Sequence, residues 1–457
     1  MSILPDRFLN KKHPHSAANA TSFVSRQVPL NVQKANASTS FHFRIGTAPN
    51  QYIDPSASFL RWKVTNKSTN CVYQLGSAGA PAMFETISLL NSGSQISQYQ
   101  NYGVFRSMKN AMNATSDWIK GPGSIMQGTC PSSHASIGRR GETIAIGSSR
   151  VFCDPICNHT SLFNSGRMVS IDTIDNLDLR YTLGDYTYGG AWDTLLTGAA
   201  KATALAALND SSLEISDLEL VLSIVQLSSE TANQLRSAHP DGNICYDCRG
   251  IGRIAATVPA GVSAHNINLG LGYSSLMALN AVQLPQYKGS TQTDSIQRVE
   301  DHNNSTFVKN NLARSLFLID GAPQENLRPI KGDLAEIAAF QQIATGNLHK
   351  YSGAVIADAG ASTDPTYSEN FEVGDVLTGN KAFVLSQDLC IYKQKDGHWA
   401  DSEMAVMCEG RGTLASSTQL NLEFNGASGK EVQMEIFPEF RTLIVLDANT
   451  KSYRVSQ

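Results

Sequence analysis

The chain has 457 residues, a formal net charge of −4 and a sequence isoelectric point of about 6.2. This balance argues against a chain that is basic throughout, so any contact with nucleic acid has to be local. Charged residues make up only 17% of the chain, against about 25% in an average soluble domain. Serine, threonine, asparagine, glutamine and glycine replace them, which favours strands and turns over salt-bridged helices.

The length predicts two domains of about 200 residues each. Without any stretch of about 18 apolar residues, we expect no membrane-spanning helix. Residues 1–25 carry basic side chains but no apolar stretch after them, which is not typical of a secretory signal. We therefore expect the eight cysteines to be reduced thiols and residues 1–25 to be a flexible N-terminal arm. The basic cluster Lys11, Lys12 and His13 in this arm is a candidate contact to genome phosphates or a membrane surface.

Strand patterns begin at Phe41–Ile45 and continue through residues 59–64, where Leu60, Trp62 and Val64 alternate with Arg61 and Lys63. This alternation predicts a strand with one face in the core. The first half adds further predicted strands, a short helical turn and an inserted alanine-rich helix. The strands are residues 84–96 with a break at 91–93, 177–183 and 218–224; the turn is 99–105 and the helix 194–208, with long loops and short strands over 115–165.

A predicted helix over Ser229–Ala238 marks the boundary between two sets of strands, with Ser229 as N-cap and His239-Pro240 as the stop. The second half repeats the pattern of the first, with one short helix over Asp333–Thr345. Its predicted strands are residues 254–258, 267–271, 276–284, 316–319, 382–392, 404–408, 420–424, 432–437, 440–446 and 453–455.

Many short strands in two successive sets, without alternating long helices, predict an all-β chain rather than a parallel α/β sheet. We predict two tandem eight-stranded antiparallel jelly rolls with short inserted helices. The expected division is an arm over 1–25, a first jelly roll over 26–228, a linker with a short helix over 229–250, and a second jelly roll over 251–457.

Two glycine-rich stretches resemble nucleotide-binding loops. Gly250–Ala255 matches G-x-G-x-x-A, but Pro259 and Gly261 follow it, and a dinucleotide site needs a helix there. In the stretch Gly426–Lys430 the first glycine is misplaced, and Glu431 stands where a magnesium-binding hydroxyl is needed. We interpret the second stretch as a turn between strands and predict no cofactor.

Two cysteine pairs, Cys153 with Cys157 and Cys245 with Cys248, could supply four sulfurs to zinc, with His159 or His239 as alternative ligands. The other interpretation is that they are ordinary thiols in loops and at strand ends, because the first spacing does not fit a zinc knuckle. A redox role for the second pair is not favoured, because no βαβ pattern surrounds these two cysteines. We therefore predict no metal, and these four residues remain the only candidates.

Catalytic motifs such as H-E-x-x-H and G-x-S-x-G do not occur, and the carboxylate pairs fall in strand or turn patterns with solvated faces. The sequence is thus interpreted as that of a structural protein and not an enzyme.

The order of these features resembles the double jelly-roll major capsid proteins of the Polinton-like virus, virophage and adenovirus hexon lineage. The resemblance covers most of residues 40–455 and lies in pattern and order. It is carried by the segments 53–64, 84–96, 99–105, 165–167, 177–183, 215–220, 317–321, 326–330 and 333–345.

The resemblance implies two upright jelly rolls per chain and three chains per pseudo-hexagonal capsomer, a homotrimer with a closed threefold interface. Capsomers would form an icosahedral shell around a genome, inside the host cell, together with penton or minor capsid proteins. The N-terminal arm would lie at the inner base. Three alternatives remain: a single-jelly-roll coat or spike, a carbohydrate-binding β-sandwich protein, and a glycoside hydrolase on a β-scaffold with paired carboxylates.

Overall fold

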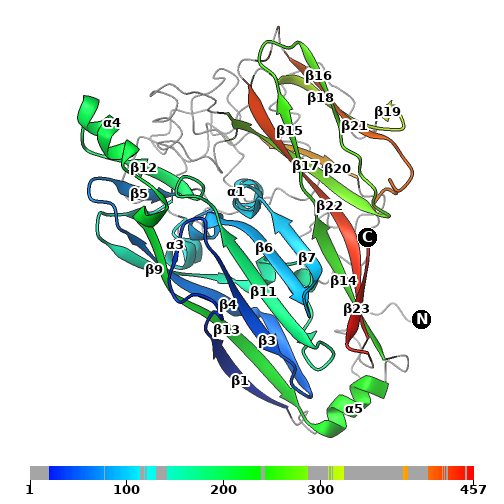
Figure 1. The fold of residues 1–457 in the computed structure, drawn as a ribbon. Helices are drawn as coiled ribbons and strands as arrows, with labels where there is room; N and C mark the ends of the chain where they lie inside the picture. Colours follow the sequence, from blue (N-terminus) through cyan, green and yellow to red (C-terminus); the bar gives the residue numbers. More distant parts are fainter. Residues whose placement is uncertain are drawn as a thin grey trace.

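The computed structural model consists almost entirely of antiparallel strands, arranged as two β-units that follow one another in the chain (Figure 1). It describes residues 20–76, 78–113, 118, 121–129, 141–237, 242–286, 307, 310, 312–323, 384–389, 410–424, 426, 428, 431–447 and 450–457.

The first β-unit contains two large sheets and one small sheet, and its strand pairs are antiparallel. One sheet has the order β1 (Ala20–Gln27), β13 (Leu213–Leu227), β4 (Gln51–Asn66) and β10 (Val169–Ser170), with β2 (Ala35–Asn36) on β13 and β9 (Ser149–Pro155) on β4. The facing sheet has the order β3 (Ser40–Gly46), β11 (Asn176–Leu183), β6 (Phe84–Asn91) and β7 (Ser94–Gln100). The small sheet has the order β12 (Gly190–Asp193), β5 (Val72–Leu75) and β8 (Thr143–Ile144).

The second β-unit repeats this plan. Its first sheet has the order β14 (Asn243–Ile251), β22 (Val432–Asp447), β17 (Leu276–Pro285) and β20 (Val384–Asp388), with β15 (Ile254–Val258) and β23 (Ser452–Ser456) on β22. Its second sheet has the order β16 (Ala264–Asn268), β21 (Thr418–Phe424), β18 (Leu312–Ile319) and β19 (Ala322–Pro323). Among the described residues, the main path of each of these four sheets has four strands, and β2, β9, β15 and β23 pair beside the paths.

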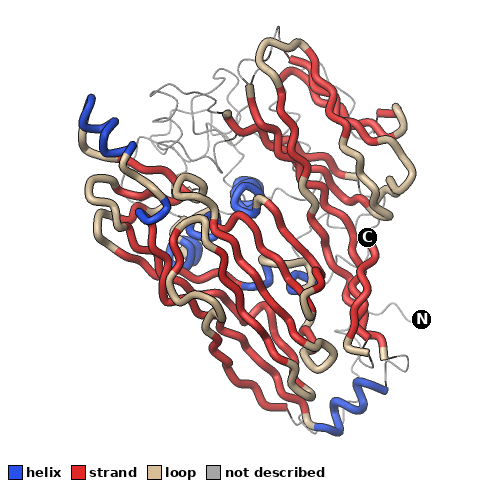
Figure 2. The backbone as a smooth tube through the Cα atoms, in the orientation of Figure 1, coloured by secondary structure: helices blue, strands red, loops and turns tan. Residues whose placement is uncertain are grey.

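Short helices connect the strands without forming a layer of their own (Figure 2). They are α1 (Tyr102–Asn113), α3 (Pro122–Gln127), α4 (Gly198–Ala206) and α5 (Ser229–Ser237), with 3-10 turns η1 (Ala80–Met83), η2 (Ile156–Asn158), η3 (Phe163–Ser165) and η4 (Asp210–Ser212). The predicted turn over 99–105 lies only partly in α1, because Tyr99 still belongs to strand β7.

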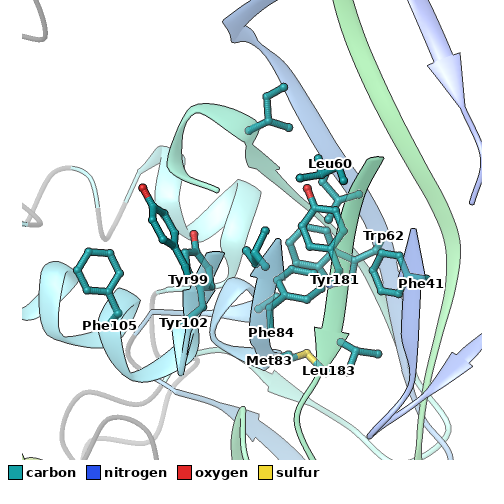
Figure 3. Packing of buried hydrophobic residues seen from close by; sticks show 14 of the residues in the cluster. Phe41, Leu60, Trp62, Met83, Phe84, Tyr99, Tyr102, Phe105, Tyr181 and Leu183 are labelled. Carbon is teal, nitrogen blue, oxygen red and sulfur yellow. The ribbon is translucent and has the colours of Figure 1, made fainter. Parts of the chain in front are cut away.

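Aromatic rings fill the space between the two large sheets of the first unit (Figure 3). Trp62 on β4 is fully buried, and its ring centroid lies 5.2 Å from that of Phe84 on the opposite sheet. Tyr181 packs on Phe84 at 5.2 Å. Such edge and tilted contacts between large rings stabilise the pairing beyond the area they bury. The prediction that Trp62 faces the core is confirmed.

The outward face of β4 is polar, as its alternation predicts. Arg61 pairs with Glu219 at 3.6 Å, and Lys63 pairs with Asp217 at 3.7 Å, both across the β4–β13 ladder. Exposed pairs of this kind contribute little to stability. The two cations determine which face of β4 is exposed to solvent, because a shift of the strand register by one residue would bury both of them.

Some predicted elements differ from the structure. Residues 20–25, expected in the flexible arm, belong to strand β1, where backbone pairing to β13 orders them. The helix over 333–345, the strand over 404–408 and the basic cluster Lys11, Lys12 and His13 lie outside the described residues. Within the part of the chain that the structure describes, none of the helices is long and apolar enough to cross a membrane.

Candidate functional site

The two β-units contact one another at a junction, whose residues form the candidate functional site. Helix α1 of the first unit lies against strand β22 of the second unit. Phe105 on the helix packs on Phe437 at 5.5 Å between ring centroids, and Lys109, one helical turn further on, donates to Glu439. The alternation of β22 places Phe437 and Glu439 on one face, while Met434 and Ile436 belong to the core of the second unit.

Glu439 is buried at this junction, and three side chains among the described residues donate to it. Besides Lys109, Arg249 on β14 donates to Oε2 at 3.1 Å and Asn280 on β17 donates to Oε1 at 2.5 Å. Burial alone would raise the pKa of this carboxyl, but Lys109 and Arg249 outweigh it, so the pKa is lowered. The carboxylate is therefore charged at neutral pH and ties three strands or helices to one point.

A second set of contacts closes the other end of the junction. The hydroxyl of Tyr246 on β14 accepts a hydrogen bond from the Ser170 amide at 3.1 Å and donates to the Met168 carbonyl at 3.3 Å. Burial raises the pKa of Tyr246 to about 12, so it is a neutral donor. Tyr453 on β23 donates to the Gln95 carbonyl at 2.8 Å. Together with α1, these bonds join the units at separate points, and we expect them to move as one body.

A wholly buried polar cluster lies inside the first unit. Asp154 accepts from His159 Nε2 at 2.8 Å and from Gln127 at 2.6 Å, and Arg106 lies 3.8 Å away. His159 Nδ1 is 2.7 Å from the hydroxyl of Tyr181. Burial opposes ionisation of Asp154, but Arg106 and the bond from His159 lower its pKa overall.

This carboxylate, imidazole and hydroxyl do not form an open catalytic site, because Asp154 and His159 are fully shielded from solvent and the hydroxyl belongs to a phenol. Burial raises the pKa of Tyr181 well above its usual range, which disfavours a nucleophilic phenolate. The cluster satisfies buried polar groups and fixes η2 against the sheet that carries Tyr181.

The comparisons with known proteins give no match by sequence but several matches by structure. Neither a protein-family model nor a curated protein matches the sequence. Solved structures do match, at low sequence identity. VP54 of PBCV-1, fitted into a reconstruction of the virophage Sputnik, aligns with a TM-score of 0.60 and 10% identity over 96% of this chain and 97% of its own.

Two further structures give the same result. The Faustovirus major capsid protein aligns with a TM-score of 0.53 and 10% identity, over 96% of this chain and 93% of its own. The mavirus major capsid protein aligns with a TM-score of 0.50 and 10% identity, over 95% and 90%. The chain has the double jelly-roll fold. The two β-units are its first and second jelly rolls, so the predicted fold class is confirmed.

The cysteine candidates are distributed over both jelly rolls. Cys153 lies on β9 and Cys157 in η2, and both are half-buried. On β14, Cys245 is exposed and Cys248 is buried, because residues three apart on a strand point to opposite faces. Burial, followed by the neighbouring Asp247, raises the pKa of Cys248, which disfavours the thiolate that a metal binds.

Metal-binding geometry is absent from the described residues, among which no three histidine, cysteine or acidic side chains group around a common point. His159 is engaged by Asp154 and Tyr181, and His239 lies outside the described residues. The stretch Gly250–Ala255 falls on β14, β15 and the residues between them, without the helix that a dinucleotide needs. Gly426 follows β21 at a positive φ of 78°, typical of a turn.

The junction residues were missed by sequence reasoning. The signal available was that Glu435 and Glu439 interrupt an otherwise apolar strand, and a buried carboxylate needs a cationic partner. Arg253 provides it for Glu435, through two bonds of 2.7 and 2.8 Å. The partner Lys109 could not be found this way, because it comes from a helix in the other jelly roll.

Proposed function

We propose that this chain is a major capsid protein, which trimerises into pseudo-hexagonal capsomers that build an icosahedral shell around a viral genome. The observation that carries the proposal is the extent of the structural match. It runs through both jelly rolls and covers at least 90% of the Faustovirus and mavirus major capsid proteins.

The junction supports a role as a building block. Two jelly rolls held together by the Lys109–Glu439 bond and by Tyr246 offer two similar wedges in one chain. Three such chains form a closed ring of six wedges under threefold symmetry, which needs only one kind of contact between copies. The function is self-assembly and requires no catalytic residue.

The alternatives fit less well. A coat protein with a single jelly roll would not contain the second set of sheets. A glycoside hydrolase needs two carboxyl groups facing one groove. The buried carboxylates Asp154, Glu435 and Glu439 are each bonded to cations or to histidine inside the structure, which favours a structural use.

We also propose that the trimer is part of the virion and contacts other capsid proteins there. Neighbouring capsomers, penton or minor capsid proteins would contact the trimer in the virion, after assembly inside the host cell. We also propose that Lys11, Lys12 and His13 meet viral DNA or an internal membrane at the inner surface, because a basic arm gains affinity from phosphate charge.

The test is the oligomeric state of the purified chain. Size-exclusion chromatography with light scattering should give a particle of three times the 49.3 kDa chain mass, and negative-stain micrographs should show six-sided outlines. A stable monomer under every assembly condition, without particles on concentration, would overturn the proposal.

A further inference from the structure

The first strands of the two jelly rolls occupy equivalent places. The sheet orders are β1-β13-β4-β10 and β14-β22-β17-β20, so β1 and β14 each pair with the long strand, β13 or β22, that stands second in its order. The registers also agree. Ala20 lies opposite Leu227, the last residue of β13, and Asn243 lies opposite Asp447, the last residue of β22.

This correspondence makes Phe23 the counterpart of Tyr246. Each is the fourth residue of its strand, and each lies directly opposite an isoleucine, Ile224 or Ile444. Directly opposed residues share a face of the sheet, so both rings point to the same relative side of their jelly roll.

The two rings differ in what covers them. Tyr246 is 2% exposed, because the first jelly roll lies on it through Ser170 and Met168. Phe23 is 43% exposed. Val24, Val28 and Leu30 are more exposed still, so four large apolar side chains within eight residues face solvent. We call Phe23, Val24, Val28 and Leu30 the apolar edge.

The apolar edge faces away from the second jelly roll of its own chain. Contacts with that jelly roll involve Ser170 on β10 and Gln95 on β7, each the last strand of its sheet order. Strand β1 stands at the other end of the same order, on the far side of the first jelly roll from β14 and β23 (Figure 1). Among the described residues, the second jelly roll of the same chain therefore does not cover Phe23 in the way that the first jelly roll covers Tyr246.

We propose that the apolar edge binds the second jelly roll of another copy of this chain, around residues 410–414. This rests on the proposed function and names the faces that would form the trimer. The segment is chosen by the same correspondence. In the first jelly roll, β10 pairs with the start of β4, and Ser170 of β10 bonds to Tyr246. In the second jelly roll, Arg411 forms a bridge with Leu276 at the start of β17. The segment that contains Arg411 is therefore the counterpart of β10.

The chosen segment also has an apolar side chain to offer. Leu414 is 68% exposed, three residues beyond Arg411. Among the described strands, β1 pairs on one side only, with β13. An edge strand with exposed apolar side chains on both faces is otherwise a site of uncontrolled association, and burying it in a closed ring removes that hazard. The internal junction thus serves as the template for the contact between copies.

The experiment places the photo-reactive amino acid p-benzoyl-phenylalanine at position 23 of the full chain, in a mixture of isotopically light and heavy copies. Irradiation should join position 23 of one copy to a peptide containing residues 410–416 of another. Cross-links to another region of a second copy, or only within one copy, would overturn the inference.

A second test measures the trimer fraction of a variant with a polar residue at position 23. Phe23→Ser should lower the trimer fraction at least tenfold at a fixed concentration, whereas Ile146→Ser, at a similarly exposed position (46%), should leave it unchanged. A trimer fraction in Phe23→Ser equal to that of the wild type overturns the apolar edge and leaves the proposed function standing. A wild-type chain that stays monomeric overturns the proposed function itself.

Discussion

Lys109 and Glu439 are 330 positions apart in the sequence, yet they bond directly across the junction between the jelly rolls. The lysine comes from helix α1 of the first jelly roll and the carboxylate from β22, a strand of 16 residues in the second. Both side chains are largely withdrawn from solvent. This buried charge pair favours one arrangement of the two jelly rolls, because separating them would leave each charge without its partner in a poorly solvated place.

Replacing Lys109 with methionine should destabilise the chain by about 3 kcal/mol, because the stem packing is kept while Glu439 loses a cation. Urea unfolding followed by fluorescence measures this. The control is Arg314→Ala, which removes an exposed partner of Glu423 at 3.3 Å and should cost under about 1 kcal/mol. An equal loss of unfolding free energy in both variants would show that the junction pair stabilises the chain no more than an exposed pair does.

Acid should weaken the same site. Glu439 has a pKa below its ordinary value in the folded chain, so its charge stabilises the fold above the unfolded pKa of about 4.3. That contribution is lost as the pH falls from there through the lowered folded value. The free energy of unfolding of the wild type should therefore approach that of Glu439→Gln below about pH 4. A constant difference from pH 7 to pH 3 would contradict this assignment.

The core of the first jelly roll was readable in the sequence because its causes are local. The alternation of Leu60, Trp62 and Val64 with Arg61 and Lys63 states which face is buried, and the structure agrees. Helix α5 also forms where its local pattern predicts it, but its cap lies one residue earlier than expected. The helix begins at Ser229, and the hydroxyl of Ser228 accepts a hydrogen bond from the Thr231 amide at 3.2 Å. Each of these signals depends on neighbours within a few positions.

What could not be read depends on distant parts of the chain. Residues 20–25 look like a loose arm, because only pairing with β13, which comes much later in the chain, makes them a strand. The Glu439 site needs α1, β14 and β17 to converge, and the role of Tyr246 needs Ser170 from the other jelly roll. Such convergence is a property of the topology, and a single sequence does not carry it.

Removing the hydroxyl of Tyr246 should loosen the other end of the junction. In Tyr246→Phe the ring stays, but the amide of Ser170 loses a buried acceptor and the carbonyl of Met168 loses a donor, at a cost of about 1–2 kcal/mol. Thermal unfolding gives the comparison with Tyr453→Phe, whose hydroxyl bond to Gln95 is exposed to solvent and should matter less. A larger loss for Tyr453→Phe would reverse this ranking.

The two cysteines of β14 should differ in reactivity with a thiol reagent. Cys245 is exposed and should be modified at once in the native chain, whereas buried Cys248, with its raised pKa, should react roughly a hundredfold more slowly. Cys245→Ser should remove one fast-reacting thiol, and Cys248→Ser should leave the fast count unchanged. Because these thiols point to opposite faces of the strand, adding a chelator should not shift the unfolding temperature. A drop of several degrees, reversed by zinc, would instead show that these cysteines hold a metal.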